Sequence, residues 1–300
     1  FLLSRTLGAS ARLYLAAGVL QNYLFEPFKI PFTVSVMIII GLILLYTYRG
    51  GIKSLVWTDA LQSLFLLSAL IITLVNLFGL INWDTAWTTI HEQNYDRIFV
   101  WDWLPRNNFF KMIIGGTLVA VTMTGMDQNM MQKNLSCKNE KEARKNILSY
   151  NSTLIFINFL FLSLGVLLYV LAVQKHLTLP VKTDGTVNTD GVFPMMAFGH
   201  LGHWAGLTFI VGLTAATFSS ADSVLTTLTT SFCIDFLKFN PDEVESERHK
   251  TTRHWAHVLF AVAIMLSMLL ISKLNNTAII TTILTVAGYT YGPLLGMFSF

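Results

Sequence analysis

Charged residues are scarce in this sequence. Asp, Glu, Lys and Arg make up 12% of the 300 residues, about half of the roughly 25% found in ordinary soluble domains. Cysteine is also rare: Cys137 and Cys233 lie in different local environments, so we expect no disulfide. No polar stretch is long enough for a second folded unit, and no nucleophile–base pair is recognisable. These absences argue against a soluble domain and against an enzyme.

Apolar residues, in contrast, make up 53% of the chain. Runs of spanning length, about 20 residues, recur along it, so we predict an all-α polytopic membrane protein with about eight spans. They cover roughly residues 12–28, 31–48, 55–80, 109–131, 148–173, 207–237, 255–272 and 277–300. We expect one transmembrane domain over residues 1–300. Because the chain begins without Met and ends inside an apolar run, we interpret it as a fragment.

The basic residues are unevenly divided between the predicted connectors. Most of the 20 Lys and Arg residues fall in alternate connectors on one side of the predicted membrane. Lys and Arg favour cytoplasmic connectors, so we expect an integral protein of the cytoplasmic (inner) membrane with both ends of the chain in the cytoplasm. The two long outside connectors carry tryptophans typical of a membrane interface, namely Trp83, Trp87, Trp101, Trp103 and Trp204.

A polar stripe interrupts the apolar run from about Leu207 to Leu237. On a helix of about 3.6 residues per turn it occupies one face, formed by Ala216, Ser219, Ser220, Ser223, Thr227 and Thr230. Polar groups at membrane depth usually face the bundle interior or a water-filled cavity, so the stripe predicts a polar pathway. Asp222 lies in the same run, where a carboxylate either couples to an ion or proton or bonds a neighbouring helix. Both interpretations stay open.

Three stretches resemble the sodium:solute symporter family. The segment from Tyr48 to Gln62 resembles its Gly-Gly…Trp-Thr-Asp…Gln signature, and residues 219–223 resemble its sodium-ligand helix. Residues 125–132 resemble its Gly-Thr-Asp-Gln…Gln-Arg segment, with Lys133 in place of the Arg. The resemblance implies a leucine-transporter-like bundle of two inverted five-helix repeats, of which this chain would cover core helices three to ten.

The same resemblance implies a set of site residues. The carbonyl of Ala216 and the hydroxyls of Ser219 and Ser220 would bind a sodium ion, a hard cation that takes oxygen ligands. Asp59 would lie on the ion's route to the cytoplasm, and its carboxylate also suits the N-terminal end of a helix. The two roles of Asp59 are compatible.

The solute side departs from the sugar carriers of the family. Their aromatic pair is replaced by Met123 and Thr124, which cannot stack on a sugar ring as tyrosine does. Met123 and Thr124 are candidates for lining the solute pocket, with ordinary helix packing as the alternative.

We therefore expect sodium-coupled symport of a small organic solute by alternating access, with the sodium ion as coupling ion. The expected partners are a small-molecule solute and the lipid bilayer, with no nucleic acid, and the sequence leaves the oligomeric state open. Two alternatives remain. One is a membrane sensor module with a transporter-like domain, and the other is a proton-coupled carrier in which Asp222 holds the proton.

Overall fold

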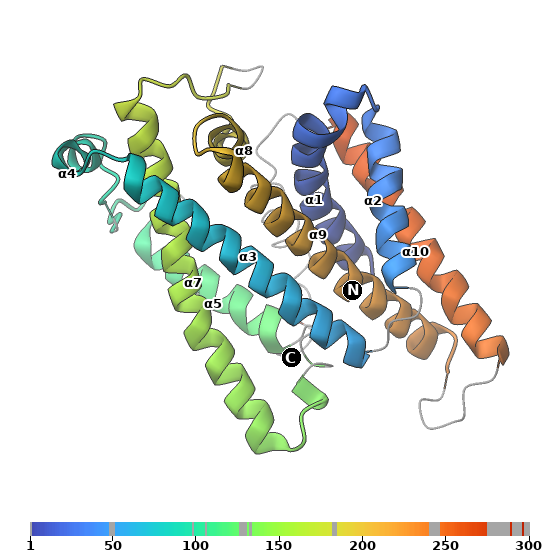
Figure 1. Cartoon of the computed structure of the whole chain (residues 1–300). Helices are drawn as coiled ribbons and strands as arrows, with labels where there is room; N and C mark the ends of the chain where they lie inside the picture. Colours follow the sequence, from blue (N-terminus) through green and yellow to red (C-terminus); the bar gives the residue numbers. More distant parts are fainter. Residues whose placement is uncertain are drawn as a thin grey trace.

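The computed structural model describes residues 2–47, 52–97, 99–105, 107–125, 131, 134–181, 185–239, 247–274, 289 and 296. These residues are mostly helical (Figure 1). They contain no β-strand, only an isolated bridge between Val181 and Val187. The predicted all-α class is therefore confirmed. The last predicted span, residues 277–300, lies almost wholly outside the described part of the chain.

The principal helices follow one another along the chain. They are α1 (Leu2–Leu20), α2 (Phe32–Thr47), α3 (Ile52–Leu80), α4 (Trp83–Glu92), α5 (Phe109–Gly125), α7 (Glu140–Gln174), α8 (Thr189–Gly199), α9 (His203–Ser231) and α10 (Glu247–Leu274). Among the described residues, four helices are each long and apolar enough to cross a membrane, and they lie in α3, α7, α9 and α10. The bent pair formed by α1 and α2 passes the same test when it is counted as one span.

The structure differs from the sequence prediction at three helix starts and in two connectors. Helices α1, α7 and α10 begin at Leu2, Glu140 and Glu247 instead of near residues 12, 148 and 255. The predicted connectors 81–108 and 174–205 contain α4 and α8. These two helices have 10 and 11 residues, too short for the spanning-length signal on which the prediction relied. The start of α4 is fixed by Asn82, whose side chain accepts a hydrogen bond from the backbone N–H of Asp84.

Helices α1 and α2 form a hairpin that is held by a polar side chain. The two helices are bent by 113° at their junction, where Lys29 adopts a left-handed conformation with φ 56°. Gln21 donates from Nε2 to the carbonyl of Ile30 at 2.8 Å, and its Oε1 accepts from the hydroxyl of Ser35 at 2.5 Å. Gln21 thus links the end of α1 to the start of α2 through these two hydrogen bonds.

Two hydrophobic cores share helix α9. One core joins α1, α2, the second half of α9 and α10, and it includes Leu13, Ile43, Leu225 and Ile264. The other joins α3, α4, α7, α8 and the start of α9. Helix α9 crosses from one core to the other and therefore packs against both groups of helices.

Helices α3 and α9 pack side by side along much of their lengths (Figure 1). Gly212 on α9 makes this approach possible. A Cβ atom at Gly212 would lie 2.8 Å from the Cβ of Ala69 on α3, well inside ordinary van der Waals contact. The missing side chain sets the distance between the two helices.

A buried histidine links three helices of the first core. The Nε2 atom of His257 on α10 lies 2.8 Å from the Thr47 hydroxyl on α2, and its Nδ1 lies 3.1 Å from the Thr229 hydroxyl on α9. Each hydroxyl also lies within bonding distance of its own helix, at Ile43 and Leu225. With a neutral ring, one threonine accepts from the ring N–H, while the other shares its single proton between the second ring nitrogen and its own helix carbonyl. Both ring nitrogens are therefore satisfied inside the protein.

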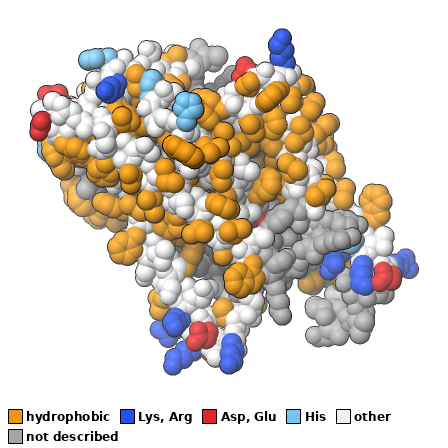
Figure 2. Space-filling view, in the orientation of Figure 1, with side chains coloured by type: hydrophobic (Ala, Val, Ile, Leu, Met, Phe, Trp, Pro, Cys, Tyr) orange, Lys and Arg blue, Asp and Glu red, His pale blue; other side chains and the backbone are white. Residues whose placement is uncertain are grey.

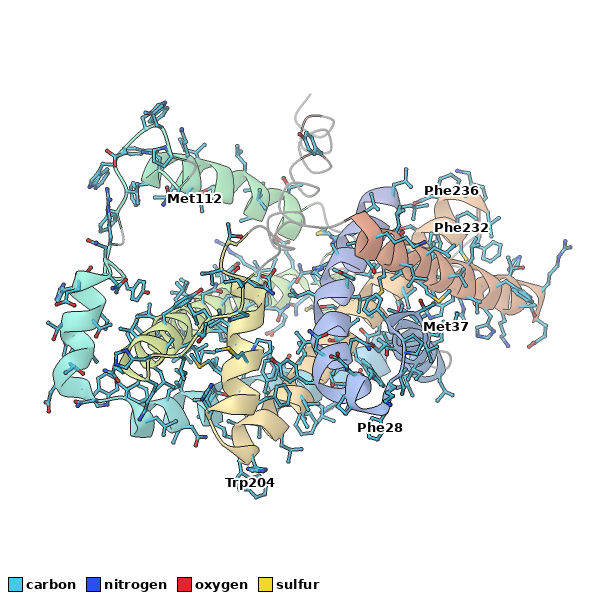
Figure 3. All side chains as sticks on the ribbon, turned by 90° about the horizontal axis from the view of Figure 1, so that it is seen from above. Phe28, Met37, Met112, Trp204, Phe232 and Phe236 are labelled. Atoms are coloured by element: carbon cyan, nitrogen blue, oxygen red, sulfur yellow. The ribbon has the colours of Figure 1, made fainter. Side chains whose placement is uncertain are left out.

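The outer surface is rich in large apolar side chains. Figure 2 shows them spread over the middle of the visible face, with charged groups mostly towards its ends. Phe28, Trp204 and Phe236, labelled in Figure 3, are among those more than half exposed. A soluble monomer rarely exposes so large an apolar area, whereas a membrane protein presents it to lipid.

The close approach at Gly212 gives a first testable expectation. Gly212→Ala forces α3 and α9 apart and lowers the free energy of unfolding by about 1–3 kcal/mol, the usual cost of overpacking. Gly165→Ala on α7 is the matched control, because its Cβ meets no atom within 4 Å. The measurement is thermal unfolding of the complete purified protein. Adding Ala69→Gly to Gly212→Ala should recover the loss, and failure to recover would contradict the assignment.

The histidine link gives a second expectation. His257→Ala removes both inter-helix hydrogen bonds and leaves a cavity, so it should lower the free energy of unfolding by about 1–3 kcal/mol. His203→Ala, at an exposed position at the start of α9, should change it by no more than about 0.5 kcal/mol. Equal shifts in melting temperature for the two variants would show that the link does not stabilise the bundle.

Candidate ion site between α3 and α9

The structure brings two predicted site residues into direct contact. Ser219, in the middle of α9, donates from its hydroxyl to Oδ1 of Asp59, in the second turn of α3, at 2.6 Å. The two residues are 160 positions apart in the chain and both are half-buried. Hydrogen bonds to a carboxylate are among the stronger ones in proteins. This bond makes the α3–α9 interface the candidate site.

The donor geometry leaves Ser219 free to bind a cation. A hydroxyl has one proton and two lone pairs, and donation to Asp59 uses only the proton. A carboxylate that accepts from a ligating group raises the basicity of that group and fixes its orientation. The Ser219 oxygen can therefore bind a cation while its O–H group donates to the Asp59 carboxylate. In this arrangement Asp59 supports the ion through Ser219.

Gln62 adds a further oxygen to the same face of α3. It follows Asp59 by nearly one helical turn, and its side-chain Oε1 atom is buried without a hydrogen-bond partner in the described structure. A buried amide oxygen without a partner is costly, so a ligand or water suits this position. Gln62 stands in the motif that starts at Tyr48, but sequence reasoning gave it no role. Its spacing of three residues from Asp59 could have indicated that the two side chains share one face of the helix.

Asp222 and Ser223 lie just beyond Ser219 on α9, and both are buried. Both carboxylate oxygens of Asp222 are shielded from solvent. Asp222 is one of several described residues that make further polar or electrostatic interactions. A buried carboxylate in a membrane bundle is a candidate functional group, and its two interpretations, ion or proton coupling and helix pairing, both stay predictions.

The other predicted sodium ligands flank Ser219. Ala216 and Ser220 are half-buried on α9, so the three predicted ligands lie within about one helical turn. They supply oxygen atoms, the ligand type that hard cations require. One helix can surround an ion on one side only, so the remaining ligands would have to come from other segments.

The predicted solute residues lie at the end of α5. Met123 and Thr124 belong to this helix, but their side chains lie outside the described part of the structure. Their assignment stays a prediction.

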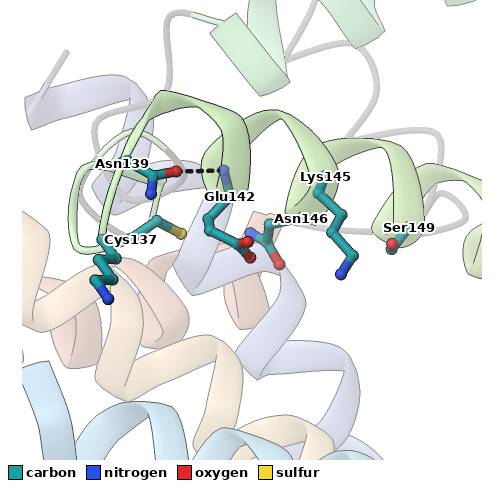
Figure 4. Close-up of a pocket in the computed structure, with 7 residues that line it drawn as sticks. Cys137, Asn139, Glu142, Lys145, Asn146 and Ser149 are labelled. Carbon is teal, nitrogen blue, oxygen red and sulfur yellow. Dashed lines mark hydrogen bonds between the residues drawn. The ribbon is translucent and has the colours of Figure 1, made fainter.

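An open hollow of about 600 Å³ lies elsewhere, at the start of α7 (Figure 4). Its lining includes Lys138, Glu142 and Lys145 and contains none of the predicted site residues. Beside it, Asn139 caps α7 by accepting from the backbone N–H of Glu142 at 2.9 Å. This hollow is therefore separate from the α3–α9 site.

Comparison with known proteins identifies similar chains. The family model described as the sodium:solute symporter family matches residues 1–300. The human sodium/iodide cotransporter is 26% identical over 260 residues, which cover 84% of this chain and 40% of that protein. The zebrafish (Danio rerio) sodium-coupled monocarboxylate transporter 2 is 25% identical over 261 residues, or 85% of this chain and 41% of that protein.

A bacterial relative and a solved structure extend this similarity. The sodium/sialic acid symporter NanT of Aliivibrio fischeri is 23% identical over 292 residues, covering 95% of this chain and 56% of that protein. A structure of the substrate-bound outward-open state of a Na⁺-coupled sialic acid symporter matches with a TM-score of 0.79 at 20% identity, over 99% of this chain and 61% of that chain. The expected symporter fold is thereby confirmed. The chain spans about half the length of the curated relatives it matches.

These relatives are named as transporters, in agreement with the expectation that the chain is not an enzyme. None of the comparisons tests the individual site residues, so Ala216, Ser219, Ser220, Asp59, Asp222, Met123 and Thr124 stay predictions.

The Asp59–Ser219 bond gives a third expectation. In the complete protein, sodium should raise the melting temperature, because a ligand that binds only the folded state stabilises it. Asp59→Asn and Ser219→Ala should each raise the sodium dissociation constant derived from that shift by about tenfold or more. This factor corresponds to the free energy of a hydrogen bond to a charged group. Because the two groups act as a unit, the sodium dissociation constant of the double variant should be close to the higher of the two single-variant values.

Thr208→Val is the control for this experiment. It removes a hydroxyl from the second turn of α9, where Thr208 donates to the carbonyls of Trp204 and Ala205 on its own helix. Its sodium dependence should equal that of the wild type. Unchanged sodium affinity in Ser219→Ala, or fully additive losses in the double variant, would contradict the paired role.

Proposed function

Because the chain belongs to the sodium:solute symporter family, we propose that the complete protein couples inward movement of sodium to uptake of a small solute by alternating access. The contact between Ser219 and Asp59 is the observation that carries this proposal. It joins a hydroxyl predicted to bind sodium to a carboxylate predicted to lie on the ion's route. A cation at this point would compensate a half-buried negative charge.

The proposed solute is a small anion. The relatives are named for iodide, monocarboxylates and sialic acid, three kinds of ligand that are all anionic. The replacement of the sugar carriers' aromatic pair by Met123 and Thr124 points away from a neutral sugar. An anion can be bound without a lysine or arginine at the membrane midplane, because the positive end of a broken helix supplies the complementary charge.

An anionic solute constrains the number of coupled ions. One sodium ion carried with one monovalent anion moves no net charge, so only the sodium gradient drives uptake. A tenfold gradient is worth about 1.4 kcal/mol, or about tenfold accumulation. A second sodium ion adds the same gradient term and one net charge, which is worth about 2.3 kcal/mol at 100 mV. Accumulation far above tenfold therefore requires more than one sodium ion per anion.

We also propose the placement of the chain in the membrane. Residues 1–300 form a single transmembrane transporter domain in the cytoplasmic membrane, with both ends of this sequence in the cytoplasm. Support comes from the basic residues at the start of α7 and at the start of α10, which would lie on one side. The exposed tryptophans Trp87, Trp101 and Trp204 would lie on the other, where aromatic rings suit the interface.

A proton-coupled carrier is the second candidate, and the burial of Asp222 favours it. A carboxyl group shielded from solvent in a helix bundle is the kind of group that takes up and releases a coupling proton. In that case Asp222 would carry the coupling ion, and Ser219 would only orient Asp59. The two candidates differ in the cation gradient that they require.

The test uses the complete protein in liposomes. Uptake of iodide, lactate, sialic acid, glucose and alanine is followed under an inward sodium gradient and then under an inward proton gradient. We expect sodium-driven accumulation of one anion and no accumulation of glucose. Ser220→Ala should weaken the sodium dependence, because it removes a predicted ligand, while Thr208→Val should leave it unchanged.

Asp222→Asn separates the two candidates. Under the sodium proposal it keeps most of the sodium-driven uptake. Loss of uptake together with a dependence on the proton gradient in the wild type would favour the proton carrier. Accumulation of glucose under a sodium gradient would contradict the anion assignment but not the symport.

A further inference from the structure

Helix α7 is much longer than a membrane requires. It has 35 residues, Glu140–Gln174, and at 1.5 Å per residue it measures about 52 Å. The hydrocarbon core of a bilayer is about 30 Å thick, so about 15 residues extend beyond it. Its buried residues, from Leu164 to Ala172, are near the C-terminal end. All charged side chains of α7 lie between Glu140 and Lys145, and charges are costly in the hydrocarbon core, so the excess falls mainly at the N-terminal end.

One face of α7 combines exposed cations with exposed apolar side chains. On a helix of about 3.6 residues per turn, the members of this face project within an arc of about 100°. They are Lys141, Arg144, Lys145, Leu148, Ile155, Phe159 and Leu162, all of them exposed. The buried Leu164, Leu168 and Leu171 project away from this arc, and the exposed face ends before Val170, which is buried. The face therefore runs continuously from a cationic end to an apolar stripe.

The cations on this face are available for an external partner. Within the described part of the chain, no salt bridge engages Lys141, Arg144 or Lys145. Glu140 and Glu142 project to either side of the arc, so neither carboxylate lies within it. Figure 2 shows several Lys and Arg side chains, with an acidic side chain among them, at the lower tip of the molecule, where Figure 1 places the first turns of α7. Figure 4 shows the Lys145 side chain extending away from the helix.

We propose that this face of α7 binds anionic phospholipid headgroups of the leaflet that borders its N-terminal end. The apolar stripe would lie along the acyl chains, and the three cations would meet the phosphates one to three turns further along the same face. The open hollow between Lys138 and Lys145, about 600 Å³ in volume, leaves room for a headgroup beside them. The cytoplasmic leaflet is the anionic one, so the surface matches the orientation proposed above.

Helix α10 shows that cations at the start of a span do not by themselves make such a surface. Its first turns carry Arg248, Lys250 and Arg253, but their spacing places Arg248 opposite the other two on the helix. Lys250 is paired with Glu247 at 2.7 Å. Helix α10 thus has the same number of cations at the start of a long helix without a shared face, and it provides a matched control.

The test measures lipid contact in the complete protein. The protein is reconstituted in phosphatidylcholine vesicles that contain a few percent of photoactivatable phosphatidylglycerol or, in parallel, photoactivatable phosphatidylcholine. After illumination, cross-links in residues 137–150 are counted by mass spectrometry. We expect phosphatidylglycerol to label this segment several-fold more than phosphatidylcholine. The ratio should fall as salt is raised, because salt screens exposed charges.

Charge variants assign the effect to the face. Basic residues near an anionic surface attract anionic lipids, so the triple variant K141Q/R144Q/K145Q should lose most of the several-fold phosphatidylglycerol excess and bring the ratio of the two lipids close to one. The charge-conserving variant K141R/R144K/K145R should keep it, as should R248Q/K250Q/R253Q on α10. These two variants also control for altered insertion or folding.

Three outcomes would overturn the proposal. The first is equal labelling of residues 137–150 by the two lipids, and the second is an unchanged ratio in the triple variant. The third is the absence of labelling by either lipid, which would mean that another protein segment covers this face. Each outcome is independent of whether the protein transports an anion, because the readout requires no uptake.

Discussion

The close contact between α3 and α9 is the constraint on which the candidate site depends. Gly212 and Ala69 let the two helices approach at one level, and less than two turns further along α9 the same interface holds Ser219 against Asp59. A hydrogen bond of 2.6 Å tolerates little separation. Small residues in one part of the interface therefore determine whether polar residues in another part can meet. The polar contact in turn satisfies a carboxylate that would be costly in a bilayer.

Helix α9 has a double role because its two faces differ. Its apolar face, with Leu225 and Leu228, belongs to the core formed with α1, α2 and α10. Its polar face meets α3, which belongs to the other core. An ion bound at the polar face would lie where the two groups of helices adjoin. Occupancy of that position can then favour one relative arrangement of the groups over another, which is how a coupling ion biases a conformational equilibrium.

The sequence predicted the parts of the structure that depend on apolar runs and on motifs. The spans in α3, α7, α9 and α10 follow from length and composition, and the motifs make Ser219 and Asp59 candidate site residues. Their pairing was not predictable, because it joins residues 160 positions apart through a helix–helix approach set by Gly212. Helices α4 and α8 were missed because they are short, and Gln62 was missed because only the fold shows that its oxygen is buried.

The contact between Ser219 and Asp59 also reconciles two roles that the sequence assigned separately. Ser219 was predicted as a sodium ligand and Asp59 as a residue on the ion's route. A serine hydroxyl that donates its hydrogen bond to a carboxylate keeps its lone pairs for a cation, and the carboxylate makes that oxygen a better ligand. The negative charge remains close enough to attract the ion without being required to coordinate it directly. Neutral oxygens would then determine how tightly the ion is bound, and Asp59 would determine that a cation enters at all.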